Sequence, residues 1–72
     1  MDYFNAANQC YNTKEYKKAI NLYKKAIENK ENEACSYYNS SVCFIKLKDY
    51  ESAINLLKSA ILLKKIQNTF LI

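Results

Sequence analysis

The 72-residue chain contains no glycine, proline, histidine, tryptophan or arginine. Without glycine it cannot form the glycine-rich loop that cradles phosphate groups. Without glycine or proline, nothing kinks a helix or marks a flexible linker between domains. Histidine is the usual general acid or base near neutral pH, so its absence weighs against catalysis. We therefore expect no enzymatic activity, no catalytic residues and no cofactor.

The metal-ligating residue types are also scarce. Cys10, Cys35 and Cys43 show no C-x-x-C spacing and have no histidine to complete a zinc site. We expect reduced thiols, with Cys10 and Cys43 serving as small packing residues on helices. The glutamates Glu28, Glu31 and Glu33 stand close together, but lysine and asparagine separate them. We interpret this segment as a solvated turn and expect no metal site.

The net charge of +4 comes entirely from eleven lysines. Lysine supplies charge without the fork geometry that lets arginine bind phosphate groups in a bidentate manner. Electrostatic binding to nucleic acid is therefore kept only as an alternative, through a lysine-rich surface formed by Lys17, Lys18, Lys24 and Lys25.

The hydrophobic content is typical of a folded globular domain, with half of the residues hydrophobic and a quarter charged. No apolar run approaches the roughly 20 residues that span a bilayer, so we expect no membrane association. Asp2 and a mixed polar and aromatic stretch follow Met1, unlike the basic and then apolar segments of a secretory signal. We expect a cytoplasmic protein.

An internal repeat is the strongest feature of the sequence. Residues 16–27 read YKKAINLYKKAI and residues 50–61 read YESAINLLKSAI, a period of 34 residues. Within each copy the apolar and small residues recur at the spacing of one helical face. The repeat predicts two copies of one helical unit, which argues for a binding scaffold.

Four helices are predicted, over residues 2–11, 15–28, 33–47 and 50–65. Asp2, Asn32 and Asp49 are the expected N-caps, because their side chains can accept hydrogen bonds from the unpaired N–H groups of a first turn. Lys64 and Lys65 suit the negative end of the last helix. Short connections between amphipathic helices favour antiparallel neighbours, so consecutive helices should form hairpins.

These residues resemble the tetratricopeptide repeat family, whose 34-residue helix-turn-helix units stack into a right-handed superhelix. The resemblance covers nearly the whole chain, although Cys10 is smaller than the preferred tyrosine and the proline that often closes a unit is missing. It rests on Tyr3, Ala6, Ala7, Cys10, Tyr16, Ala19, Tyr23 and Ala26 in the first unit, and on Tyr37, Ser40, Ser41, Phe44, Tyr50, Ala53, Leu57 and Ala60 in the second. The expected fold class is all-α, two stacked helix-turn-helix hairpins that form an α-solenoid fragment.

The expected division of the chain is a first hairpin at residues 1–34, a second at 35–66, and a tail at 67–72 that resembles the start of an unfinished third repeat. Gln9 corresponds to Cys43 one period later, which suggests that the first unit is a polar cap and that Met1 lies near a true N-terminus. A short array should expose an apolar end. We expect a homodimer or a partner to bury it, unless the chain is a fragment of a longer array, around Leu56, Leu63, Ile66 and Phe70.

The resemblance implies a concave groove lined by the outward side of the first helix of each unit, where peptides or protein segments bind. A carboxylate clamp is not expected, because Phe4 replaces the first-helix lysine and no fifth helix is present, although Asn8 and Asn39 match the two asparagines of such clamps. We expect a protein-protein interaction module, with a self-assembly module as a further alternative to nucleic-acid binding. The candidate peptide-binding residues are Phe4, Asn8, Tyr11, Tyr38, Asn39, Val42 and Ile45.

Overall fold

A computed structural model describes residues 2–69, and the side chains of residues 2–64. Within this range the chain forms helices and turns and contains no strand. The four helices are α1 (Tyr3–Asn12), α2 (Tyr16–Glu28), α3 (Glu33–Lys46) and α4 (Tyr50–Thr69). The predicted all-α fold class is confirmed.

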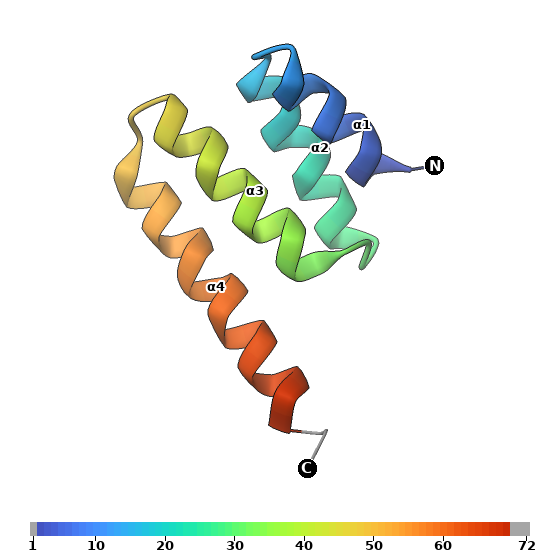
Figure 1. Ribbon diagram of the computed structural model, residues 1–72, viewed down its shortest axis with the longest axis vertical. Helices are drawn as coiled ribbons and strands as arrows, with labels where there is room; N and C mark the ends of the chain where they lie inside the picture. Colours follow the sequence, from blue (N-terminus) through green and yellow to red (C-terminus); the bar gives the residue numbers. More distant parts are fainter. Residues whose placement is uncertain (1, 70–72) are drawn as a thin grey trace.

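Each helix packs against the next one along the chain and runs in the opposite direction (Figure 1). The helices α1 and α2 form one hairpin, and α3 and α4 form the other, in agreement with the helix-turn-helix repeat expected from the sequence. The two hairpins meet where α2 packs on α3. The chain is thus a row of four helices, with α1 and α4 at its two ends.

Two of the three predicted N-caps make the expected side-chain hydrogen bond. The Asp2 carboxylate accepts a hydrogen bond from the backbone N–H of Asn5 at 3.1 Å, and Asp49 accepts one from Ser52 at 3.3 Å. Asn32 occupies the predicted N-cap position of α3, but its side chain makes no cap hydrogen bond. Asn32 instead takes the left-handed backbone conformation, with φ at 45°, and its carbonyl accepts from the N–H of Ser36.

Lysines occupy the left-handed positions that end the helices. Lys14 and Lys48, which are one repeat apart, both have φ at 64°, and Lys30 has φ at 58°. Glycine usually fills such positions after a helix, because it has no Cβ to clash. Because lysine stands where glycine is usual, the left-handed conformation at these turns costs free energy.

The core lies where α1, α2 and α3 meet. Ala7, Ala19, Tyr23 and Cys43 form its buried cluster, and Tyr23 is the largest fully buried side chain of the described residues. Small residues let the helix backbones approach, and the tyrosine ring fills the space beside them. Cys43 is fully buried whereas Gln9, its equivalent in the first unit, is exposed, as the contrast between the two residues predicts.

The last helix differs from its prediction in two respects. It continues to Thr69, so Lys64 does not lie in its last turn. Of the apolar face expected from the sequence, Leu56 and Leu63 are half-buried rather than exposed, while Ile66 and Phe70 lie outside the described side chains. Among the described side chains of α4, the exposed large hydrophobic ones are Tyr50, Ile54, Ile61 and Leu62.

Candidate functional site

A hollow of about 520 Å³ opens between α1 and α3, with α2 beneath it. Helix α1 contributes three side chains at helical spacing, and α3 contributes three from its middle turns. Tyr23 of α2 reaches the hollow from below. The lining residues are Asn8, Tyr11, Asn12, Tyr23, Tyr38, Asn39 and Val42.

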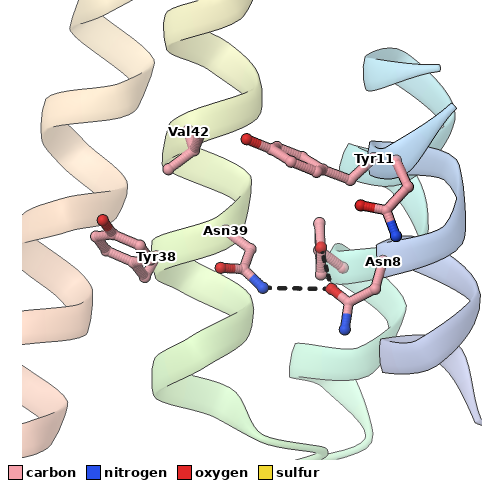
Figure 2. A pocket seen from close by; sticks show the side chains of 7 residues that line it. Asn8, Tyr11, Tyr38, Asn39 and Val42 are labelled. Atoms are coloured by element: carbon pink, nitrogen blue, oxygen red, sulfur yellow. Dashed lines mark hydrogen bonds between the residues drawn. The ribbon is translucent and has the colours of Figure 1, made fainter. Parts of the chain in front are cut away.

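Two asparagines from different units are joined at this hollow (Figure 2). The Nδ2 of Asn39 donates a hydrogen bond of 3.3 Å to the Oδ1 of Asn8. The hydroxyl of Tyr23 donates to the same oxygen of Asn8. This shared acceptor fixes the orientation of both amides. Among the described residues, the Nδ2 of Asn8 and the Oδ1 of Asn39 have no hydrogen-bond partner within the chain.

The hydroxyl of Tyr23 stays protonated under all ordinary conditions. Burial disfavours its charged form and raises the pKa of Tyr23 to about 12, against an ordinary value of 10.0, although the nearby Asn39 amide acts in the opposite direction. A protonated phenol can donate to Asn8, whereas a phenolate could not. The amide pair therefore has a permanent donor beneath it near neutral pH.

Tyr11 and Val42 provide the apolar part of the hollow. Figure 2 shows the ring of Tyr11 extending from α1 toward Val42 on α3, while Tyr38 points from α3 toward the side of α4. The Tyr11 ring is held edge-on by Tyr16, with 5.8 Å between the ring centroids. The site thus places two amide groups beside an aromatic and a branched apolar side chain.

Five of the seven residues proposed from the sequence line this hollow together: Asn8, Tyr11, Tyr38, Asn39 and Val42. Phe4 lines an adjacent hollow instead, which it shares with Tyr38 and Asn39. Ile45 is exposed and lines neither of these two hollows. The sequence placed Tyr23 in the repeated helical pattern but did not predict its contact with the hollow. The requirement that a buried tyrosine hydroxyl find a partner is the signal that could have revealed it.

The interpretation of Glu31 as a solvated turn residue is wrong. Its side chain is half-buried, and its Oε1 accepts a hydrogen bond of 3.2 Å from the backbone N–H of Phe4. Glu31 therefore connects the turn between the two hairpins to the first turn of α1. Within the described residues, no group of three or more cysteine, aspartate or glutamate side chains could hold a metal ion.

The four lysines of the surface considered for nucleic-acid binding are exposed, but two of them contact side chains of this chain. Lys18 pairs with Glu15 at 3.4 Å, and the Lys25 ammonium lies 5.8 Å from the centroid of the Tyr3 ring. Among the thiols, Cys35 is exposed and Cys43 is buried, and burial raises the pKa of Cys43 to about 11. In residues 2–69, no helix is both long enough and apolar enough to cross a membrane.

Comparison with known proteins gives one match. The sequence model of the family described as "Anaphase-promoting complex, cyclosome, subunit 3", a family of tetratricopeptide-like repeats, matches residues 2–60. No curated protein and no solved structure matches the chain significantly. The family match covers most of the chain, including the first repeat unit from residue 2 and the second unit as far as residue 60. The chain therefore belongs to this family of tetratricopeptide-like helical repeats.

Proposed function

We propose that the hollow between α1 and α3 binds an extended peptide segment of a partner protein. The observation that carries this proposal is the amide pair of Asn8 and Asn39, which Tyr23 orients from below. The pair leaves the NH2 group of Asn8 and the carbonyl oxygen of Asn39 unused among the described residues, so it offers both donors and an acceptor. A peptide main chain needs both, because each of its residues carries one acceptor and, proline aside, one donor.

The family supports a binding role in general terms. Tetratricopeptide-like repeats generally act as protein-interaction modules without catalytic activity. The hollow suits the same role, since Tyr11 and Val42 offer apolar contact beside the amides. Hydrogen bonds to the main chain of the peptide would provide affinity, and the apolar contacts would select its side chains.

A peptide selection tests the proposal. The chain is immobilised and used to select binders from a displayed library of random 12-residue peptides, and the affinity of the selected peptides is then measured by fluorescence anisotropy. Asn39→Ala and Val42→Glu should each weaken binding by about 1 kcal/mol or more, because they remove an amide contact and an apolar contact. Asn39→Ala leaves the Tyr23 hydroxyl bonded to Asn8, so the fold is retained.

Leu62→Glu is the matched control. Leu62 is exposed on α4 and lines none of the hollows found in the described residues, so this change should leave peptide affinity unaltered. Equal affinity of the selected peptides for the wild-type chain and for both hollow variants would contradict the proposal.

A further inference from the structure

The 34-residue repeat allows the same apolar positions to be compared in the two units. Five apolar residues of the first unit are half-buried, and in each case the residue 34 positions later, in the second unit, is exposed. The exposed fractions in the second unit are 56% for Tyr38, 42% for Ile45, 57% for Tyr50, 51% for Ile54 and 62% for Ile61. Their half-buried equivalents are Phe4, Tyr11, Tyr16, Ile20 and Ile27.

We call these five exposed side chains the open face. Tyr38 and Ile45 lie seven residues apart on α3, so they share one side of that helix. Tyr50, Ile54 and Ile61 recur at spacings of four and seven on α4 and likewise share one side. Five of the seven exposed large hydrophobic residues of the described side chains thus belong to this face; the other two are Leu47 and Leu62.

In the first unit, α3 covers the equivalent surface. Ile20 and Ile27 of α2 line a shared hollow with Ser40 and Phe44 of α3. The buried side chains that α3 carries toward α2 are small: Ser36, Ser40 and Cys43 have exposed fractions of 0%, 3% and 0%. These residues stand at positions i, i+4 and i+7, which form one stripe along a helix. A stripe of small residues lets the two helix backbones approach closely.

The second unit leaves the equivalent place empty within the described residues. A hollow of about 470 Å³ lies there, and its lining includes Tyr38, Leu57, Ala60, Ile61 and Lys64. Ala26 is fully buried in the first unit, whereas its equivalent Ala60 is only half-buried. Helix α4 continues to Thr69 instead of turning after the position equivalent to Glu28, so no described segment folds back onto this face.

A second copy of the chain that docks head to tail through α1 is a poor occupant. Its α1 is the helix that corresponds to α3, but the positions equivalent to Ser36, Ser40 and Cys43 are Asp2, Ala6 and Gln9. Docking through α1 would bury a carboxylate and an amide against Ile54 and Ile61 without polar partners, which is unfavourable. Such head-to-tail contacts would also build an open filament rather than a closed dimer.

We propose that the open face docks an α-helix of a partner protein that carries small side chains at i, i+4 and i+7 and an acidic residue in its first turn. The interface repeats the packing of α3 on α2, shifted by one unit. The helix begins near Lys64, just as α3 begins near the equivalent Lys30. An acidic residue in that first turn, equivalent to Glu33 of α3, lies at the positive end of the docked helix.

The test uses a peptide with the sequence of residues 33–46 of this chain, held helical by a hydrocarbon staple on its solvent side and labelled with a dye. This probe carries the small stripe and the acidic first turn. Fluorescence anisotropy during titration with the full chain should show saturable binding, and Ile61→Glu or Ile54→Glu should weaken it at least tenfold. A peptide with Ser40→Leu should also bind at least tenfold more weakly, because the larger side chain holds the helices apart.

Leu62→Glu is again the matched control, because Leu62 is 60% exposed, next to Ile61 in sequence, but outside the open face. It should leave binding of the helical peptide unchanged. The proposal is overturned if Ile61→Glu and Leu62→Glu behave alike, or if the peptide does not bind. It is also overturned if the chain dimerises through Ile54 and Ile61, since a second copy is then the occupant. None of these variants changes a residue that lines the hollow between α1 and α3, although Tyr38 lines both hollows. Weaker helix binding by Ile61→Glu with unchanged affinity for the selected peptides therefore separates this proposal from the proposed peptide site.

Discussion

The carboxylate of Glu31 accepts a hydrogen bond from the backbone N–H of Phe4, which precedes it by 27 residues. Asp2 accepts from the next N–H of the same turn, that of Asn5. The first turn of α1 is thus capped by one local carboxylate and one distant carboxylate, both favourably placed at the positive end of the helix. The distant cap fastens α1 to the turn between the two hairpins and so helps to fix the geometry of the hollow.

Removing this distant cap should destabilise the chain. We predict that Glu31→Ala lowers the free energy of unfolding by about 1 kcal/mol, because a helix N-terminus loses a charged acceptor. Urea unfolding followed by circular dichroism measures the change. Glu28→Ala is the control, since Glu28 is exposed and should change stability by less than about 0.5 kcal/mol. Equal losses for the two variants would show that the bond to Phe4 contributes nothing.

The left-handed lysines offer a stabilising change. Lys14 and Lys48 each adopt φ at 64°, where a side chain costs about 1–2 kcal/mol that glycine avoids. Glycine also gives the unfolded chain more freedom, so the net gain from Lys14→Gly or Lys48→Gly should be about 0.5–1 kcal/mol. Lys17→Gly, inside α2, should instead destabilise by about 1 kcal/mol. The urea denaturation midpoint of each variant measures whether it is stabilised or destabilised. If all three variants are destabilised, the left-handed conformation of Lys14 and Lys48 does not cost the free energy that we assign to it.

Stability should fall in alkali because of Tyr23. Its pKa is about 12 in the folded chain against 10.0 ordinarily, so its contribution is complete below pH 10 and is lost as the pH rises from 10 to 12. The full loss is roughly 2–3 kcal/mol. Cys43, with its pKa raised from 9.0 to about 11, adds a loss that begins near pH 9.

The variant Tyr23→Phe separates the two groups. It removes the phenol and should cost about 1 kcal/mol near neutral pH, because the bond to Asn8 is lost. Its stability should then decline between pH 9 and 11 only, as Cys43 ionises. Urea unfolding across this pH range is the measurement, and a decline up to pH 12 that is the same in variant and wild type would exclude Tyr23 as the cause.

The repeat and its helical faces were readable from the sequence because they depend on local spacing. Four helices and the caps Asp2 and Asp49 follow from patterns within one turn or one period. Asn32 makes no side-chain cap bond at its N-cap position, where the turn before α3 requires a left-handed residue and asparagine tolerates that conformation. Asparagine is favoured both as a side-chain cap and at left-handed turn positions, so its presence alone does not show which of the two roles it takes.

The errors at α4 and Glu31 have a different origin. Helix α4 carries apolar residues on two sides, one with Leu56 and Leu63 and another with Ile54 and Ile61. A periodic pattern shows which residues share a side, but not which side meets a neighbouring helix. The hydrogen bond between Glu31 and Phe4 joins residues that are 27 positions apart, so no pattern within one segment of the sequence predicts it. For the hollow, the resemblance to the repeat family implied the asparagines, while the hydroxyl of Tyr23 that orients them required the packed structure.

The side-chain amide signals of Asn8 and Asn39 test the central claim most directly. Nuclear magnetic resonance spectra of the 15N-labelled chain are recorded during titration with a peptide selected as described above. The Nδ2 signals of both asparagines should shift with saturation, together with the backbone signals of Tyr11 and Val42, since those residues line the hollow. Shifts confined to Lys17 and Lys24 of α2 or to Ile54 and Ile61 of α4, with the two amides unmoved, would contradict it.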